Sequence, residues 1–191
     1  MTTQPLVQRC GEHDVRPAHL AKLAGQHEAG FHVGQDQYTF TEYLGERPAL
    51  SVRKTSLRRI PYDLNTENGW HQDGAFLGEG IRTMNFWIAL TDCGVDAPSM
   101  DMVPNRLNYI VPTGTEGAQF DWSVSSKMIA EVCDGGQPTH LNFKAGDAIV
   151  FDEMNLHRTS TLPEMTKDRY AIEAWFFAPS CYPMDQLPLM V

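Results

Sequence analysis

Two histidines and one aspartate in this sequence have the residue types and spacing that bind a transition metal. His71 and Asp73 lie two residues apart in the string Trp-His-Gln-Asp-Gly. If this string is extended, both side chains point to the same face and Gln72 points away. His157 follows much later, in a short polar stretch after the strand predicted at 146–151. Two histidines and one carboxylate on one face of a metal, with the opposite face open, are the ligands of non-haem Fe(II) oxygenases, and this chemistry is the working hypothesis.

A candidate anion-binding side chain, Arg169, lies twelve residues after His157. It begins a buried strand, and guanidinium is the side chain best suited to hold a carboxylate through two parallel hydrogen bonds. Thr159 lies two residues past His157, so its hydroxyl faces the same way as the imidazole if the strand continues. Arg158 is a rival anion clamp, but in an extended strand it points opposite to His157, which favours Arg169. Glu173 shares the face of Arg169, where it either orients the guanidinium or only neutralises its charge.

Taken together, these features resemble the phytanoyl-CoA dioxygenase family of Fe(II)/2-oxoglutarate-dependent dioxygenases, which includes ectoine hydroxylase. The resemblance rests on the Trp-His-Gln-Asp string at 70–73, the strand Phe-Trp-Ile-Ala-Leu-Thr-Asp at 86–92, and the Gly-Asp-x-hydrophobic-hydrophobic-Phe strand before His157. It covers about residues 50 to 180. The sequence departs from the family at 96–106, where an Asn-Gly-x-Leu and a Pro-Gly-Ser-His turn are usual and only a Val-Pro pair is present. The substrate loop of the family therefore cannot be carried over to this chain.

The resemblance implies an oxygenase that uses O2 to oxidise a small-molecule substrate and decarboxylates 2-oxoglutarate to succinate. Fe(II) would be held by His71, Asp73 and His157, with no catalytic residue beyond these ligands. The 2-oxoglutarate would chelate the iron, and its far carboxylate would be held by Arg169 and Thr159. Related halogenases lack the carboxylate ligand so that chloride can bind. The presence of Asp73 therefore favours hydroxylation or a related oxidation such as desaturation.

The same resemblance places further residues around the cosubstrate and substrate. Asn85 would contact 2-oxoglutarate, with a satisfied polar group inside a barrel as the alternative. Trp87 shares the face of Asn85 and either lines the pocket or fills core volume. Lys54, Ser56 and Arg58 share one strand face and would line the pocket, or else form a solvated basic edge that discourages strand pairing. Basic residues in the pocket would suit an anionic or carboxylate-bearing small molecule.

The pattern of elements predicts a mainly β fold with a helical N-terminal portion. Strands are predicted at 50–60, 81–90, 139–143, 146–151 and 169–177. Residues 38–44 are predicted as a short strand or irregular edge, and 91–112 as loop. Helices are predicted at 16–29 and, as a short insertion, at 123–133. About seven or eight short strands fit a double-stranded β-helix, the jelly-roll or cupin-like barrel, whose mouth suits a metal.

Length and charge narrow the function classes. At 191 residues the chain is expected to form one domain, 1–191. Lys plus Arg number 15 against 24 Asp plus Glu, and the net charge of −9 argues against nucleic acid or an anionic membrane as partner. The sequence has no apolar run of about 18 residues and no charged-then-apolar leader, which predicts neither a membrane span nor secretion but a cytoplasmic location. The four scattered cysteines favour free thiols over a disulfide framework.

Several alternatives stay open from the sequence. The apolar tail at 179–191 either packs back across the domain or meets a second subunit, so a homodimer through this tail is one expectation. A cupin-type isomerase or lyase would use the same three ligands without 2-oxoglutarate, and Arg169→Ala would then leave its activity largely intact. A non-catalytic metal-binding jelly roll would bind metal weakly and consume no cosubstrate.

Overall fold

The computed structural model describes residues 21–23, 40–63, 68–78, 80–183, 185 and 187–191. Its strands are β1 (Ala21–Leu23), β2 (Ala49–Ser51), β3 (Ser56–Ile60), β4 (Thr83–Ala89), β5 (Ser99–Met102), β6 (Thr139–Leu141), β7 (Ala148–Asp152), β8 (His157–Ser160), β9 (Arg169–Phe177) and β10 (Pro188–Met190). Its helices are α2 (Gly74–Leu77), α3 (Ser126–Val132) and the 3-10 turn η1 (Pro179–Cys181). Residues 40–44 are also helical.

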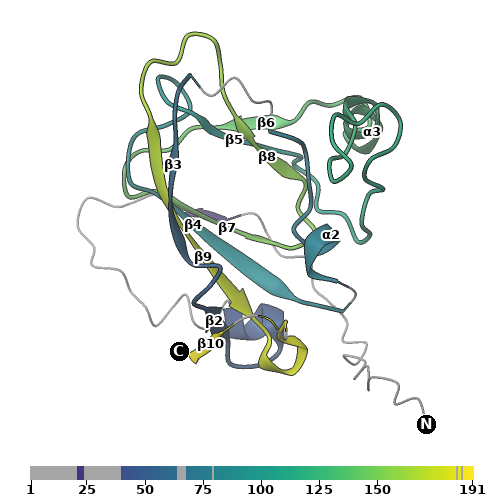
Figure 1. The fold of residues 1–191 in the computed structure, drawn as a ribbon, viewed down its shortest axis with the longest axis vertical. Helices are drawn as coiled ribbons and strands as arrows, with labels where there is room; N and C mark the ends of the chain where they lie inside the picture. Colours follow the sequence, from purple (N-terminus) through teal and green to yellow (C-terminus); the bar gives the residue numbers. More distant parts are fainter. Residues whose placement is uncertain (1–20, 24–39, 64–67, 79, 184, 186) are drawn as a thin grey trace.

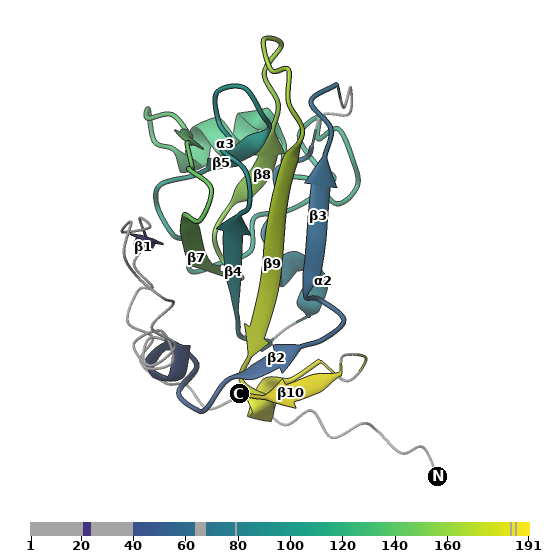
Figure 2. The same cartoon turned by 90° about the vertical axis from the view of Figure 1, so that its left-hand side faces the viewer.

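The strands form two antiparallel sheets that face each other (Figure 1). The larger sheet has the order β1-β7-β4-β9-β2-β10, and β3 also pairs with β9. The smaller sheet has the order β6-β5-β8. Figure 2 shows β7, β4, β9 and β3 side by side, with β5, β8 and α3 behind them. This architecture confirms the predicted mainly β fold class with a short inserted helix, α3.

The centre of the larger sheet consists of β4, β7 and β9, whose sequences are almost continuously apolar. All five residues of β7 are buried, as are six of the seven in β4. Such continuous apolar runs are typical of strands that are covered on both faces. Trp87 pairs with Glu173 of β9 and Ile149 of β7. Because directly paired residues share a face, this register turns one row of side chains from three strands toward the smaller sheet.

Hydrophobic cores lie on both faces of the larger sheet. The core between the sheets includes Trp87 from β4, Met102 from β5 and Phe151 from β7. On the outer face, Phe86 and its neighbours pack against helical residues 40–44. A third cluster joins α3 to the loops beside it. Close packing on each side makes the strands a rigid frame for the residues that they carry.

Two elements begin with local features that their residues favour. Helix α3 begins with Ser125 as N-cap, whose hydroxyl accepts a hydrogen bond from the Met128 backbone N–H. A tight turn precedes β7, since the Asp147 N–H donates to the Lys144 carbonyl at 2.9 Å. Gly146 in this turn has a φ of +94°, a conformation that glycine adopts without strain.

Two predictions for the N-terminal part need correction. The helix predicted at 16–29 lies largely outside the described residues, and the three described residues form β1, which pairs with β7. The segment predicted as a strand or edge at 38–44 is helical at residues 40–44. Its aromatic and polar residues alternate like a strand, but Phe40 and Leu44 lie four residues apart and both bury in the outer core, which is helical spacing.

Two further segments differ from their predicted form. The strand predicted at 50–60 is divided into β2 and β3 by a turn. In that turn the Ser51 hydroxyl accepts a hydrogen bond from the Lys54 N–H, and the Ser51 carbonyl accepts one from the Thr55 N–H. Serine commonly bonds the backbone in this way, which offers an alternative to strand pairing. The segment predicted as loop at 91–112 contains β5, the central strand of the smaller sheet.

The cysteines do not all follow the prediction of free thiols. Cys93 and Cys133 are free, whereas Cys181 is disulfide-bonded. The prediction is therefore wrong for Cys181. Pairing depends on which distant segments the fold brings within bonding distance, and the scattered cysteines carry no spacing signal for it.

The C-terminal tail packs back against the larger sheet through β10. This strand pairs with β2 in antiparallel register, although Leu187, Leu189 and Met190 keep more than half of their surface exposed. A homodimer through this tail stays a prediction. In the described part of the chain, no helix has both the length and the apolar character needed to cross a bilayer.

Candidate metal centre

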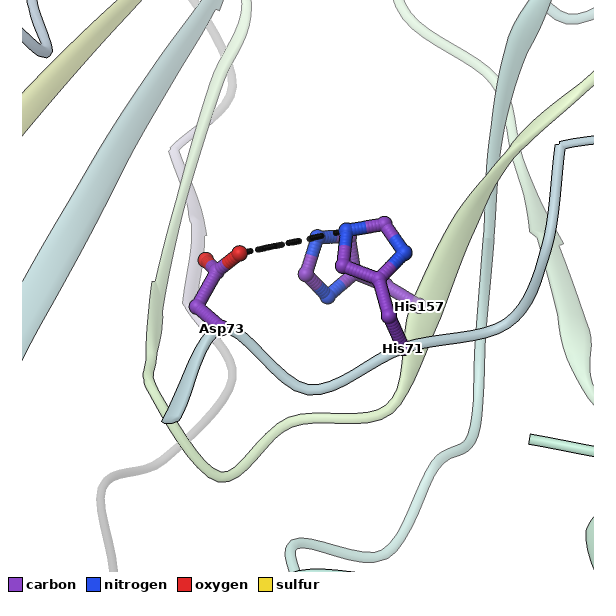
Figure 3. Close-up of side chains that lie close together, drawn as sticks. All are labelled: His71, Asp73 and His157. Atoms are coloured by element: carbon purple, nitrogen blue, oxygen red, sulfur yellow. Dashed lines mark ion pairs between the residues drawn. The ribbon is translucent and has the colours of Figure 1, made fainter. Parts of the chain in front are cut away.

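His71, Asp73 and His157 lie together, with their side chains directed toward one another (Figure 3). Asp73 Oδ1 is 3.8 Å from His71 Nε2 and 4.0 Å from His157 Nε2. One ligand atom from each residue lies within 4.8 Å of the other two. At metal–ligand distances of about 2 Å, one ion between them can contact all three. Among the residues that the structure describes, no other group of three metal-binding side chains is this close together.

Two segments far apart in the sequence bring these ligands together. The backbone N–H of His71 donates to the carbonyl of His157 at 3.0 Å, and the reverse hydrogen bond has the same length. Asp73 is not in an extended strand, contrary to the prediction. Its φ of −59° and ψ of −32° place it at the start of α2. The turn into a helix, rather than alternation along a strand, therefore carries this carboxylate to the histidines.

Backbone carbonyls orient both imidazoles. His71 Nδ1 lies 3.0 Å from the Gly69 carbonyl, and His157 Nδ1 lies 3.0 Å from the Asn155 carbonyl. A carbonyl only accepts, so both Nδ1 atoms carry the hydrogen and both Nε2 atoms keep a lone pair. These Nε2 atoms face Asp73. Neutral imidazoles with the second ring nitrogen held in place are typical metal ligands.

Burial sets the protonation of the three side chains. Desolvation raises the pKa of Asp73 to about 6, opposed chiefly by the charge of His71. Desolvation lowers the pKa of His71 to about 4, and it also lowers the pKa of His157. Asp73 Oδ2 is buried without a hydrogen-bond partner. A divalent cation would compensate a desolvated carboxylate and would prefer neutral imidazoles, so the donor set fits a metal such as Fe(II).

Gln72 is a structural residue that the sequence prediction missed. Predicted to point away from the metal, it is almost fully buried. Its side-chain amide donates to the carbonyls of Met154 at 2.7 Å and Tyr109 at 3.0 Å, and its oxygen accepts from the Val111 N–H at 2.8 Å. Gln72 thus fixes the ligand segment against two other loops. Because every partner is a backbone group, no sequence motif could have indicated it.

Arg169 is buried inside the barrel, with 2% of its surface exposed. Its Nη1 donates to the Ser99 carbonyl at 2.9 Å, while its Nε has no hydrogen-bond partner. The guanidinium lies 5.3 Å from the centre of the Trp87 ring, and no carboxylate of the described residues forms an ion pair with it. Burial lowers its pKa to about 10. A buried cation with an unused N–H is suited to an anionic ligand.

The strand register places Thr159 and Asn85 on the interior face. Thr159 pairs with Met100 and His157 pairs with Met102, and both methionines belong to the core between the sheets. Thr159 therefore faces the same way as His157. Asn85 is buried in β4, and its Oδ1 has no hydrogen-bond partner. The alternative prediction was that every polar atom of Asn85 is hydrogen-bonded within the barrel, and the unpaired Oδ1 does not fit it.

Charged residues on the interior face of β3 and β9 pair differently from the prediction. Glu173 does not orient Arg169, because its Oε2 is bonded to Arg58 Nη1 at 3.0 Å. Ser56 is the register partner of Glu173 and is exposed. Lys54 lies in the turn before β3, with its Nζ 4.7 Å from the centre of an indole ring, that of Trp175.

The rival clamp Arg158 faces away from the metal. Its Nη2 and Nε donate to Asp101 Oδ2 at 2.9 and 3.0 Å, and its guanidinium lies over the Trp70 ring. His140 bonds the other oxygen of Asp101 at 2.7 Å. Arg158 is therefore committed to a network outside the barrel interior, which agrees with the preference for Arg169.

An aromatic cluster borders His71 on its solvent side. The ring centres of Phe76 and Trp122 lie 5.7 and 5.9 Å from the His71 ring and 6.2 Å from each other. Phe120 stacks on Trp122 at 5.0 Å. The sequence prediction missed these residues, because they come from α2 and from the loop before α3 and have no fixed spacing to the ligands.

The two facing sheets and their pair of histidines with one carboxylate define a class, the non-haem Fe(II) oxygenases. A profile of the family described as phytanoyl-CoA dioxygenase (PhyH) matches residues 61–162, more than half of the chain. The chain belongs to the phytanoyl-CoA dioxygenase family, as the sequence resemblance predicted. Fe(II) and 2-oxoglutarate are the cofactors of this family. The matched segment contains all three candidate metal ligands, whereas Arg169 lies beyond it.

Solved structures of oxygenases share the fold. EctD from S. alaskensis with bound Fe is 15% identical, with 77% of this chain and 50% of that chain covered and a TM-score of 0.62. AviO1 from Streptomyces viridochromogenes Tue57 is 20% identical, with 92% and 74% covered and a TM-score of 0.53. EvdO2 from Micromonospora carbonacea var. aurantiaca, complexed with 2-oxoglutarate, is 14% identical, with 84% and 62% covered and a TM-score of 0.54.

The chain spans only part of the length of these solved structures. It spans 32% of EvdMO1 and 58% of the non-heme monooxygenase ThoJ in its apo form. At identities below 25% these likenesses establish the fold and not the substrate. No match to the chain was found among curated protein sequences.

Proposed function

We propose that this chain hydroxylates a small-molecule substrate and converts 2-oxoglutarate to succinate and CO2. The observation that carries the proposal is the group of His71, Asp73 and His157, in which two Nε2 atoms and one carboxylate oxygen converge and only His71 is partly exposed. Bound Fe(II) would supply the redox chemistry, with one oxygen atom of O2 entering succinate and the other entering the substrate. The protein would hold the ion from one face and leave the opposite face open to 2-oxoglutarate and O2.

The chain's own residues would prepare this site before the reactants arrive. The carbonyls of Gly69 and Asn155 keep the hydrogen on Nδ1 of each imidazole, so neither histidine has to lose a proton on binding the ion. Asp73 has to be ionised, and the ion would stabilise its charged form in a buried place. The low exposure of Asp73 and His157 would also keep bulk water from the reacting atoms.

Arg169 supports the assignment of 2-oxoglutarate as cosubstrate. Its buried guanidinium would take the far carboxylate of 2-oxoglutarate, because it has an unused N–H and no acidic partner among the described residues. The hydroxyl of Thr159 would add a hydrogen bond to the same carboxylate. Asn85, whose amide oxygen is unpaired, would contact the cosubstrate from β4. Trp87 would form the wall beneath the guanidinium.

Asp73 supports hydroxylation or desaturation over halogenation, because a carboxylate occupies the coordination position that a halide would need. The proposed enzyme is a single domain, 1–191, located in the cytoplasm.

An anaerobic titration tests the proposal. Adding Fe(II) and then 2-oxoglutarate should produce a visible charge-transfer band, and His157→Ala should abolish it because one of the ligands is lost. His140→Ala is the matched control, since it removes a histidine that is bonded to Asp101 and Gly94 outside the barrel. Its band should equal that of the wild type.

The result also separates the alternatives. A colourless wild-type mixture that nevertheless binds Fe(II) would favour the cupin-type isomerase or lyase. Weak metal binding without succinate formation would favour a non-catalytic jelly roll. A band that persists in His157→Ala would overturn the ligand assignment.

A further inference from the structure

Lys54 is a cation on the interior side of the larger sheet that has no acidic partner among the described residues. Arg58 is neutralised by Glu173 at 3.0 Å, and the proposed function assigns Arg169 to 2-oxoglutarate. The ammonium of Lys54 lies instead over the ring of Trp175, 4.7 Å from its centre. A cation held over an indole is positioned while its outward side stays available for an anion.

The position of Lys54 relates it to the metal centre. The side chain is half-buried in the turn between β2 and β3. Trp175, under the ammonium, is the register partner of Asn85 on the interior face of the larger sheet. Lys54 therefore stands on the interior side of the larger sheet, over the neighbour of Asn85, the residue that the proposed function places against the cosubstrate.

A second observation concerns the aromatic cluster of Phe76, Phe120 and Trp122. Phe76 is 52% exposed and Trp122 is 41% exposed, although aromatic side chains usually contribute to a core when burial is available. Both rings contact the ring of His71. A molecule that approaches the metal past His71 would meet these rings and would cover them.

We propose, on the basis of the proposed function, that the substrate is a carboxylate-bearing molecule with an apolar or aromatic body. Lys54 would bind its carboxylate, and the rings of Phe76 and Trp122 would pack against its body. The carbon to be oxidised would then lie between these contacts, above the metal. The structure thereby assigns a specificity-determining role to three residues that are not metal or cosubstrate ligands.

The charges near Lys54 favour a carboxylate over a phosphate. Arg58 is already paired with Glu173, so the ammonium of Lys54 is the charge left for the substrate in this place. One ammonium balances the single negative charge of a carboxylate. A phosphate monoester carries about two negative charges at neutral pH, and one of them would stay uncompensated.

Matched fluorinated probes test this proposal in the anaerobic enzyme loaded with Fe(II) and saturating 2-oxoglutarate. The probes are aryl alkanoates with a para-trifluoromethyl group and chains of different length, each compared with its neutral amide and with the aryl phosphate. Fluorine NMR titration measures the affinity of each. At least one carboxylate should bind about tenfold more tightly than its amide and its phosphate counterpart. Its signal should broaden more with Fe(II) than with Zn(II), which places it near the metal.

Variants identify the contacts. Lys54→Met should weaken binding of the carboxylate about tenfold and leave binding of the amide and of 2-oxoglutarate unchanged. Trp122→Ala should weaken binding of a carboxylate probe and of its amide by the same factor. Trp122→Phe should restore much of the lost affinity. Lys127→Met is the control, because Lys127 is exposed on α3 and paired with Glu116.

Three outcomes would overturn the proposal. They are the failure of every carboxylate to bind, equal affinity for carboxylate and amide, and a Lys54→Met variant that loses 2-oxoglutarate affinity instead of probe affinity. The charge-transfer band in the same samples reports the proposed function separately. A band without probe binding rejects the substrate class alone, whereas the absence of a band rejects the proposed function.

Discussion

Arg169 carries a positive charge inside the barrel with an incomplete set of hydrogen bonds. Arg169→Met should weaken 2-oxoglutarate binding by about a hundredfold, because charge-assisted hydrogen bonds to the far carboxylate are lost. The same variant without metal and cosubstrate should be at least as stable as the wild type, since an unpaired buried charge is removed. Anaerobic titration of the visible band gives the affinity, and Tm gives the stability.

Arg158→Met provides the control for this prediction. It removes an arginine of β8, in the smaller sheet, whose hydrogen bonds go to Asp101, outside the barrel interior. Its affinity for 2-oxoglutarate should match that of the wild type. Unchanged affinity in Arg169→Met would mean that another residue holds the far carboxylate. Turnover that needs no 2-oxoglutarate and is unchanged in Arg169→Met would support an isomerase or lyase.

At the residue scale, the sequence predicted the groups whose chemistry is specific and missed those whose role depends on a partner. His71 and His157 are histidines beside strands, where this residue type is uncommon. Arg169 is a charged residue at the start of a largely apolar strand, which indicates a specific role. Glu173 shares the face of Arg169, as alternation predicts, yet it bonds Arg58 on the neighbouring strand. Alternation along one strand fixes the face of a side chain but not the strand register that selects its partner.

At the element scale, Gln72 connects the ligand segment to two loops. Gln72→Ala would leave the carbonyls of Tyr109 and Met154 and the N–H of Val111 without their partner. It should lower the free energy of unfolding by roughly 2–4 kcal/mol. It should also lower metal affinity by about tenfold, because the two neighbouring ligands lose a fixed backbone. Urea unfolding and an anaerobic Co(II) titration measure the two effects.

A destabilised variant elsewhere shows whether the effect on the metal is local. Ile129→Ala would open a cavity under α3, where the side chain is buried, with a loss of stability in the same range. Its affinity for Co(II) should stay at the wild-type value. If Ile129→Ala lowers metal affinity as much as Gln72→Ala does, the role given to Gln72 is wrong.

The sequence predicted those helices and strands whose formation depends on local sequence rather than on tertiary contacts. Strands β4, β7 and β9 are largely apolar runs, and α3 has its own N-cap, so each has a strong local signal. The start of α2 at Asp73 has no such signal, because it depends on the burial of Gln72 in the preceding position. The helix at 40–44 likewise forms because its two apolar residues meet a sheet face, which is a tertiary contact.

At the scale of the whole molecule, the two sheets hold ligands from distant parts of the chain in one place. His71 and Asp73 precede β4, whereas His157 begins β8 and Arg169 begins β9. Their geometry therefore depends on global folding rather than on any one segment. A buried glutamate, Glu153, connects the segment after β7 to the start of β4. Its carboxylate accepts a hydrogen bond from the Thr83 N–H at 2.9 Å.

Glu153 should make the stability of the whole molecule depend on pH. Burial, and secondly the charge of Asp152, raises its pKa to about 7 from an ordinary value of 4.5. Between these values the folded state binds more protons than the unfolded state, so stability falls as pH rises. The contribution is fully present below pH 4.5 and is lost as pH rises through about 7. Its size is on the order of 3 kcal/mol.

Glu153→Gln should remove this contribution, because an amide does not ionise and its oxygen can still accept from the Thr83 N–H. The difference in unfolding free energy between variant and wild type should shift in favour of the variant from pH 5 to pH 8 by roughly 2–3 kcal/mol. The difference cancels the other titrating groups, including Asp73. A constant difference over this range would mean that the Glu153 carboxyl group ionises equally in the folded and unfolded states.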